Sequence, residues 1–316
     1  MALDRALSQA ACFPDPNARQ TRHCVTTDPT GFSYDEAFSR NLGWVTADEQ
    51  ARLRGSRVAI AGLGGVGGVY LLTLARLGIG AFTLADFDTF SVANLNRQAG
   101  ATIRSIGQPK LDVMIEMARD INPHLDIRRF DSGVTPDNVA DFLDGASLYL
   151  DGLDFFALQI RRTVFALCAE RGIPAVTVAP LGMGAALLNF VPGGQTFEQY
   201  FRLEGHSEPE QALRFLVGLS PAMLQIGYLV DPSRVRLAEQ SGPSTVIGVQ
   251  LCSGVAAAQA LKLILARGPV VAAPWGLHFD AYRNRLKRTW RPGGNDNPLQ
   301  RLIIRIARQR LQQRMG

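Results

Sequence analysis

The segment from Gly62 to Gly68, with the sequence GLGGVGG, places five glycines between a short apolar run and a helical pattern. Glycines at this spacing allow a tight turn and a close approach of the backbone to a ligand, and the amino end of the following helix favours phosphate. Asp86 ends the next apolar run, where a carboxylate can accept hydrogen bonds from ribose hydroxyls, and Asp88 follows in the same loop. The pattern predicts a nucleotide site formed by Gly62, Gly64, Gly65, Gly67, Asp86 and Asp88.

Two cations beyond this loop indicate which nucleotide binds. Arg97 lies between Asn94 and Gln98 in the sequence, and Lys110 ends the segment GQPK. Positive charge here suits the β and γ phosphates and the departure of pyrophosphate, whereas a nicotinamide dinucleotide does not require it. The sequence also has no obvious proton-transfer His or Tyr-Lys motif, so an NAD-dependent oxidoreductase is disfavoured.

The elements that must hold these residues alternate between strands and helices. Thr46 and Glu49 have the spacing of a capping box at the start of a short helix. Strands are predicted over 58–61, 81–85, 126–130, 147–150, 175–178 and 185–191, with helices over 69–77, 111–121, 156–171 and 246–266 and a closing hairpin over 277–290. We therefore predict an α/β fold, a Rossmann-like doubly wound and mostly parallel sheet extended by a β-rich C-terminal half.

Composition limits the class of protein. The chain has 316 residues, 47% hydrophobic and 19% charged, which is typical of a globular protein. Of its 33 Lys and Arg residues, ten lie between Arg283 and Gly316, against one of the 28 Asp and Glu residues. The basic character is therefore local to one end, and it does not by itself indicate nucleic-acid binding by the whole protein.

The four cysteines, Cys12, Cys24, Cys168 and Cys252, form no C-x-x-C pair. This spacing excludes a four-thiolate zinc site and disfavours a disulfide framework, so a reducing cytoplasm is the expected location. The apolar stretch 246–266 contains Gln250, Gln259 and Lys262, which favours a buried helix over a membrane span.

Over residues 34–290 the chain resembles the ThiF/MoeB superfamily, which includes ubiquitin-activating enzymes. The motifs that carry the resemblance are GLGGVGG, LADFDTFSVANLNRQ, GQPK and Asp151-Gly-Leu-Asp154. It implies ATP-dependent adenylylation of a carboxylate with release of pyrophosphate, and ATP and Mg²⁺ as cofactors. The glycines would hold the phosphates and Asp86 the ribose. The phosphate oxygens would be bound by Asn94, Arg97 and Lys110, with Gln98 beside them.

The resemblance further implies that Asp154 holds magnesium. It also implies a homodimer, because Arg40 matches an arginine that reaches into the partner subunit's ATP site. The chain departs from the family at Phe155, where an asparagine usually follows the aspartate, and it lacks the C-x-x-C zinc pairs. No cysteine occurs between Val178 and Ser244, so no candidate for a transfer thioester is found in that segment, and no zinc site is expected.

The acceptor of the adenylate is left open. The first hypothesis is that the acceptor is the C-terminus of a ubiquitin-like or sulfur-carrier protein, or of a peptide. The alternative is that the protein is an enzyme like the tRNA threonylcarbamoyladenosine dehydratase. The amide- or heterocycle-forming enzymes of peptide natural-product pathways are a third relative. A nucleotide-binding scaffold without catalysis is kept open by Phe155.

Three regions are predicted along the chain. Residues 1–33 form an irregular arm, residues 34–291 the adenylating domain, and residues 292–316 a linker followed by a basic amphipathic helix. The apolar positions of that helix follow helical spacing with arginines between them, so it can dock on the parent domain or dimer partner, lie at an anionic membrane, or contact RNA. We expect this helix to be free to move and dispensable for folding and for the chemistry.

Overall fold

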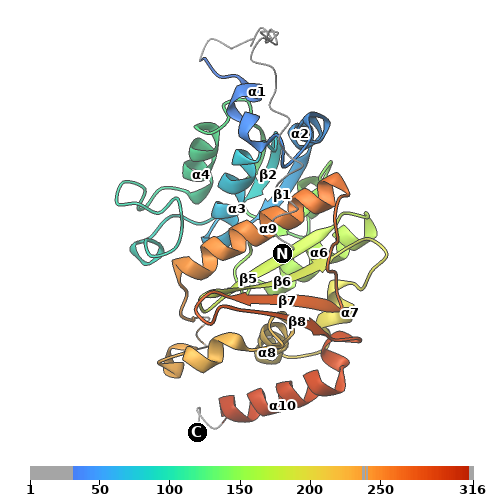
Figure 1. The fold of residues 1–316 in the computed structure, drawn as a ribbon. Coiled ribbons are helices and arrows are strands. Elements are labelled where there is room, and N and C mark those ends of the chain that lie inside the picture. Colours follow the sequence, from blue (N-terminus) through green and yellow to red (C-terminus); the bar gives the residue numbers. More distant parts are fainter. Residues whose placement is uncertain (1–30, 237–238, 240, 313–316) are drawn as a thin grey trace, which may run out of the picture.

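The structure is a computed structural model that describes residues 31–236, 239 and 241–312 (Figure 1). Cys12, Cys24 and nearly all of the expected N-terminal arm lie outside these residues. One eight-stranded sheet runs through the molecule in the order β3-β2-β1-β4-β5-β6-β7-β8. Its strands are β1 (Arg57–Ala61), β2 (Ala81–Ala85), β3 (Asp126–Phe130), β4 (Leu148–Asp151), β5 (Ala175–Leu181), β6 (Gly184–Phe190), β7 (Trp275–Asp280) and β8 (Arg285–Trp290).

The first five strands form the parallel half of the sheet. Val58 pairs with Phe82 of β2 on one side and with Leu148 of β4 on the other, so β1 is central. The two faces are covered by helices because alternate residues of each buried strand point to opposite sides. One face packs against α2 (Ala47–Arg54), α3 (Gly65–Arg76), α4 (Lys110–Arg119) and α9 (Val246–Leu265). The other packs against α5 (Val139–Phe142), α6 (Leu158–Glu170), α7 (Phe197–Phe201) and α8 (Glu208–Leu219).

The last three strands form the antiparallel half. β6 pairs antiparallel with β5 and with β7, and β7 pairs antiparallel with β8. This arrangement confirms the predicted mostly parallel sheet with a β-rich C-terminal extension. α9 is long and apolar enough to cross a membrane, but it packs on β5, β6 and α3, and Cys252, Ala256 and Ala260 are buried there. α9 is a core helix of this fold.

Short elements lie between these helices and strands in the described residues. The capping box predicted from Thr46 and Glu49 begins α2, with both of its hydrogen bonds present. The remaining short elements are α1 (Tyr34–Ala37) and the 3₁₀ turns η1 (Ser39–Asn41), η2 (Val92–Asn94), η3 (Leu224–Tyr228), η4 (Pro232–Arg234) and η6 (Gly294–Asp296).

The C-terminal segment is packed, contrary to the expectation of a mobile linker and helix. In η6, the fully buried Asn295 donates hydrogen bonds to the carbonyl oxygens of Phe201 and Arg214. α10 (Pro298–Gln312) lies along α8, where Ile304 is 3% exposed against Leu213 and Val217. Of the roles considered for this helix, the structure shows docking on the parent domain, because one side of the apolar surface of α10 packs against α8.

Candidate nucleotide-binding site

The glycine-rich loop connects β1 to α3 at the carboxyl end of the parallel strands. Gly62 has a positive φ of 82°, and a Cβ there would lie 2.3 Å from the carbonyl oxygen of Gly152. A Cβ on Gly67 would lie 1.7 Å from the carbonyl oxygen of Gly62. Both glycines are therefore required by the close packing of this loop against α3 and the end of β4.

Gly64 and Gly65 differ from these two glycines. A Cβ would lie 3.5 Å from the Gln98 side chain at Gly64 and 3.4 Å from Val249 at Gly65. Packing within the protein thus does not require glycine at these two positions. Close approach of a phosphate to the amino end of the helix would require it. The Gln98 side chain beside Gly64 is buried, and its Oε1 atom has no hydrogen-bond partner among the described residues. An orphaned polar atom next to an open loop fits a site for a polar ligand.

Asp86 and Asp88 lie in the loop after β2. The carboxylate of Asp86 accepts hydrogen bonds from the backbone nitrogens of Leu63 (2.6 Å) and Asp88 (2.8 Å), which ties it to the glycine-rich loop. Burial raises the pKa of Asp86, and these two hydrogen bonds partly oppose the shift. Each carboxylate oxygen retains a lone pair, so Asp86 can still accept a hydrogen bond from a ribose hydroxyl.

Lys110 begins α4 with its side chain only 8% exposed, and it pairs with the Asp88 carboxylate at 2.8 Å. Hydrogen bonds join residues 88–90 to residues 107–110, including Lys110 N to the carbonyl oxygen of Asp88. A buried ammonium needs an anionic partner, and a triphosphate can replace or supplement Asp88 in that role. The structure therefore brings Lys110, Asp86, Asp88 and the glycine-rich loop together.

Arg97 and Asn94 lie in the segment between these loops. The guanidinium of Arg97 donates hydrogen bonds to Ala93 O (3.0 Å) and Asn96 Oδ1 (2.8 Å), and Asn94 Oδ1 accepts one from Ser91 N (3.0 Å). Both side chains thus bond within their own segment, and Arg97 is next to Gln98. Asn96 also bonds to the carbonyl oxygen of Ser244, which fixes this segment against the start of α9.

Asp154 lies in the loop between β4 and α6, two residues after the Gly152 that contacts Gly62. Its side chain is exposed, and Oδ1 accepts a hydrogen bond from Phe156 N at 2.9 Å. Oδ2 forms no hydrogen bond with the described residues. Carboxylate oxygens are the ligands that Mg²⁺ prefers, so Asp154 fits the magnesium role in its chemistry and in its place beside the loop.

Phe155, which stands where the family usually has asparagine, does not enter the open site. Its ring lies 4.9 Å from that of Phe156 and 5.2 Å from that of Phe215 in α8. The residue therefore extends the aromatic core under the loop, and the polar contact that an asparagine side chain would offer is absent at this position.

The structure does not bring Arg40 to the site of its own chain. Arg40 is exposed in η1, and the neighbouring Asn41 donates a hydrogen bond to the carbonyl oxygen of Leu77, at the carboxyl end of α3. The glycine-rich loop is at the other end of this 12-residue helix, ~18 Å away. A role for Arg40 at a nucleotide site therefore requires a second subunit.

The two described cysteines are buried, and they form no metal site with other described residues. Cys168 and Cys252 are free thiols inside the core, as predicted, and burial raises the pKa of Cys168 to about 12. Among the described residues, no three His, Cys, Asp or Glu side chains are grouped so that they could hold a metal ion.

Two features were missed by sequence reasoning. Arg161 of α6 is buried and forms an ion pair with the buried Asp151. Its signal was an arginine on the apolar face of a helix, at the spacing of Leu158, Phe165 and Cys168. The second feature is a basic groove along β8, with a volume of about 560 Å³. Its signal was the excess of Lys and Arg from Arg283 onward, but the sequence did not show that five of these cations line one groove.

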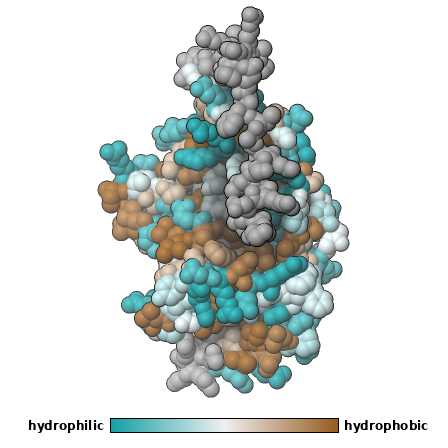
Figure 2. Space-filling model, viewed as in Figure 1, coloured by the Kyte–Doolittle hydropathy of each residue, from teal (hydrophilic) through white to brown (hydrophobic). Residues whose placement is uncertain are grey.

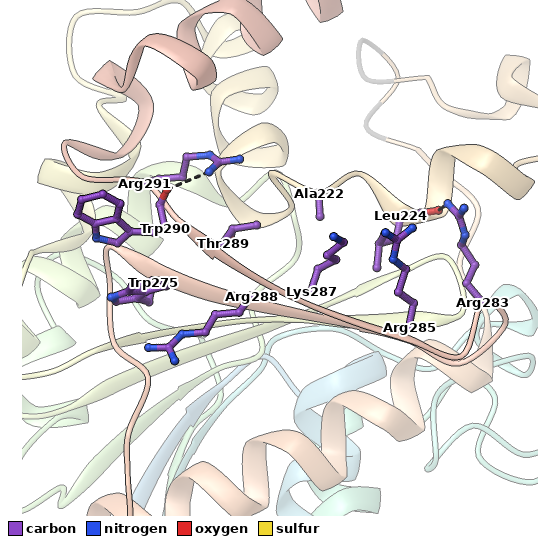
Figure 3. Close-up of a pocket in the computed structure, with 10 residues that line it drawn as sticks. All are labelled: Ala222, Leu224, Trp275, Arg283, Arg285, Lys287, Arg288, Thr289, Trp290 and Arg291. Carbon is purple, nitrogen blue, oxygen red and sulfur yellow. Dashed lines mark hydrogen bonds between the residues drawn. The ribbon is translucent and has the colours of Figure 1, made fainter.

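Figure 3 shows the basic groove between the hairpin of β7 and β8 and the segment after α8. Within the described chain, none of its cationic side chains forms an ion pair with a carboxylate. Trp290, at its end, is 54% exposed. The cations that line the groove are Arg283, Arg285, Lys287, Arg288 and Arg291.

The match to a family model agrees with this geometry. Residues 38–301 match the ThiF family, which is most of the chain. The fold and the loop geometry define a member of this class, and the chain belongs to the ThiF family.

Named relatives carry two kinds of activity. The chain is 34% identical over 151 residues to a tRNA threonylcarbamoyladenosine dehydratase of Haemophilus influenzae, covering 48% of this chain and 57% of that protein. It is 29% identical over 193 residues to the sulfur carrier protein ThiS adenylyltransferase of Escherichia coli, covering 61% and 76%. The chain thus spans about half the length of the dehydratases that it matches.

The fold is shared with solved structures. A crystal structure of Escherichia coli MccB with ATP superposes with a TM-score of 0.60 at 17% identity, covering 80% of this chain and 70% of that one. At this identity the similarity establishes the fold alone.

Proposed function

We propose that this protein catalyses the ATP-dependent adenylylation of a carboxylate. The observation that carries the proposal is the convergence of the open Gly64 and Gly65 backbone, the orphaned Gln98 and the Lys110–Asp88 pair at one end of a ThiF-family sheet. A dinucleotide oxidoreductase would not need the buried ammonium at this point.

ATP is a substrate of the proposed reaction. The backbone at Gly64 and Gly65, with Gly62 and Gly67 shaping the loop, would hold its phosphates, and Asp86 its ribose. Lys110, Arg97 and Asn94 would bind the phosphate oxygens. Asp154 would hold Mg²⁺, which neutralises charge on the phosphates when bound.

In this reaction a carboxylate oxygen of the acceptor attacks the α-phosphorus of ATP. The bond from the α-phosphorus to the bridging oxygen of the β-phosphate breaks, and pyrophosphate leaves with the electron pair. Lys110 is suited to stabilise this departing charge because its buried ammonium interacts strongly with phosphate in a poorly solvated place. The products are an acyl-adenylate and pyrophosphate.

A direct test uses calorimetry with MgATP, followed by exchange of labelled pyrophosphate into ATP with candidate acceptors. We expect MgATP to bind and exchange to appear only with the correct acceptor. Absence of MgATP binding would overturn the proposal, and binding without exchange for any carrier protein, peptide or RNA would favour a scaffold without catalysis.

The first acceptor that we propose is the C-terminus of a ubiquitin-like sulfur-carrier protein or a peptide. This proposal is supported by the ThiS adenylyltransferase, which matches over 76% of its own length. Figure 2 shows hydrophobic side chains gathered on the left of this face of the molecule. The exposed apolar side chains beside the nucleotide loops, which suit a protein surface, are Val92, Leu95, Val246 and Ile247. A carrier that ends in Gly-Gly is the probe for this case.

The second acceptor is a carboxylate on RNA, as in the dehydratases that act on tRNA threonylcarbamoyladenosine. The basic groove favours it, because cations without a carboxylate partner beside an exposed tryptophan suit a phosphate backbone and a stacked base. Filter binding of tRNA at increasing salt, with wild type and Arg285→Glu/Lys287→Glu, tests this case. Equal and weak binding by both proteins would remove RNA as the acceptor.

A homodimer would complete the site through Arg40. Asn41, next to Arg40, lines an apolar groove of about 460 Å³ between α3 and α9, with Gly254, Ala257 and Leu261 on its α9 side. An apolar face next to an arginine too distant for its own loop suits a symmetric contact between two copies. Sedimentation at micromolar concentration tests the dimer, and a monomer would contradict it.

Peripheral contacts and location are secondary proposals. Leu299, Leu302 and Ile306 stay exposed on α10 beside Arg301 and Arg305, which suits an anionic membrane or RNA at this surface. Co-sedimentation with anionic vesicles tests the first of these contacts. The free thiols of Cys168 and Cys252 fit the cytoplasmic location that we propose.

A further inference from the structure

Arg161 is a charged residue inside the core, at the level of the loop that carries Asp154. Its side chain is 3% exposed, and Nε donates a hydrogen bond to Asp151 Oδ2 at 2.8 Å. Asp151 ends β4 and its side chain is 2% exposed. Burying two charges costs desolvation free energy that their attraction often only balances, so stability alone is a weak reason for such a pair.

The other nitrogens of Arg161 reach the loop itself. One terminal nitrogen donates to the carbonyl oxygens of Leu153 (2.8 Å) and Asp154 (3.0 Å), and the second donates to that of Phe155 (3.3 Å). Three consecutive carbonyls are thus turned inward to one planar guanidinium. The Asp154 side chain is left on the outside, where it is exposed beside the glycine-rich loop.

The guanidinium is held in place from two further directions. Its carbon lies 4.7 Å from the centre of the Phe215 ring in α8, and Phe155 packs against the same ring at 5.2 Å. Asp151 Oδ1 lies 3.4 Å from the backbone nitrogen of Leu153, at the start of the loop. A lysine could keep the ion pair with Asp151, but it has no planar fork to bind three carbonyls.

We infer that Arg161 is a positioning residue that holds the loop at residues 153–155 so that the Asp154 carboxylate faces the Mg²⁺ of bound MgATP. This inference rests on the proposed function, because it assigns Arg161 a role in magnesium-dependent nucleotide binding. Arg161 itself touches neither nucleotide nor metal; it acts through Asp154.

The test compares Arg161→Lys with Arg162→Lys. Arg162 is the next residue of α6 and pairs with Glu198 at 2.7 Å, without contact to the loop, so the same change there is a matched control. Calorimetry measures the affinity of each full-length protein for ATP with Mg²⁺ and with EDTA. For Arg161→Lys we expect at least a tenfold loss of affinity for MgATP and less than a twofold change for ATP in EDTA. Arg162→Lys should match wild type in both.

Hydrogen exchange at residues 152–156 gives a readout that does not depend on catalysis, and we expect faster exchange there in Arg161→Lys only. If Arg161→Lys does not fold, the double variant Asp151→Asn/Arg161→Gln removes both charges while keeping polar groups. The same loss of MgATP affinity is expected from it. Failure of wild type to bind MgATP would overturn the proposed function together with this inference. Wild-type binding with equal magnesium dependence in the variants would overturn the role of Arg161 alone.

Discussion

The two halves of the sheet differ in how they are held together. In the parallel half, the proposed site consists of loops that follow β1, β2 and β4, and its contacts join neighbouring loops, such as Asp86 with Leu63 and Lys110 with Asp88. In the antiparallel half, contacts join distant segments, such as Ser220 with His278 and Asn295 with Phe201. The parallel half therefore contains the sequence motifs of the proposed site, while the antiparallel half is held by contacts between segments that are distant in the sequence.

This difference suggests a division of roles. The loops that bind nucleotide in the proposed function are fixed by hydrogen bonds between loops that are neighbours in space, and by a contact of Asn96 with Ser244 before α9. The antiparallel half contributes a basic edge at β8, together with α8 and α10, and substitutions at this edge would affect the proposed RNA acceptor more than the ATP site.

The largest effect is expected for Gly67→Ala in the parallel half. The new Cβ would collide with the carbonyl oxygen of Gly62 at 1.7 Å, and neither backbone can move without disturbing β1 or α3. We expect a loss of about 3 kcal/mol or more in the free energy of unfolding, measured with urea.

Gly65→Ala is the control, because its Cβ would meet Val249 at an ordinary 3.4 Å. It should change the free energy of unfolding by less than about 1 kcal/mol. Equal stability of the two variants would show that close packing is not the reason why glycine is needed at position 67.

The next effect concerns chemistry and leaves the fold intact. Asp154→Ala should abolish nearly all magnesium-dependent turnover, because its exposed carboxylate is the proposed metal ligand. Lys110→Ala and Arg97→Ala should each slow adenylate formation at least tenfold, about 1.4 kcal/mol of transition-state stabilisation. Pyrophosphate exchange with the true acceptor measures all three, with circular dichroism as the check of folding. Unchanged exchange in any of them would remove that residue from the site.

Prediction was easiest where the signal lies in consecutive residues. Local signals were sufficient for the capping box at Thr46 and for the β1-α3-β2 unit, whose strand and helix periods are written in consecutive residues. Docking of α10 on the parent domain was among the predicted roles, but its fixed attachment was not predicted, because Asn295 and Gln300 bond to Phe201 and Val217, which lie far away in the sequence. The role of Arg161 was missed because a buried arginine among apolar residues reveals a partner only once Asp151 is placed beside it.

Truncation after Pro292 tests whether η6 and α10, which pack beside α7 and α8, are dispensable for ATP binding. It removes the buried Ile304 and leaves the carbonyls of Phe201, Arg214 and Val217 without their side-chain donors. We expect a loss on the order of 3 kcal/mol in the free energy of unfolding, with MgATP affinity of the folded fraction unchanged. Leu302→Ala, at a half-exposed position of α10, is the control and should have little effect on urea unfolding. Loss of MgATP binding in the folded truncated protein would show that the ATP site depends on the C-terminal segment.

The smallest effect is a pH dependence that belongs to the antiparallel half. His278 of β7 is 2% exposed, its Nδ1 lies 2.9 Å from the Ser220 hydroxyl, and its Nε2 has no partner among the described residues. Burial lowers the pKa of His278 below its ordinary 6.5, although the nearby Asp280 opposes the shift. Below pH 6.5 His278 therefore binds a proton in the unfolded chain but stays neutral in the folded protein, so the folded state loses stability as the pH falls. The loss approaches about 1.4 kcal/mol per pH unit until the folded histidine also titrates. Urea unfolding of wild type between pH 5 and 7.5 should show this slope, His278→Gln should lack it, and the control His206→Gln, in a partly exposed loop, should retain it. A slope that survives in His278→Gln would assign the pH dependence to other groups.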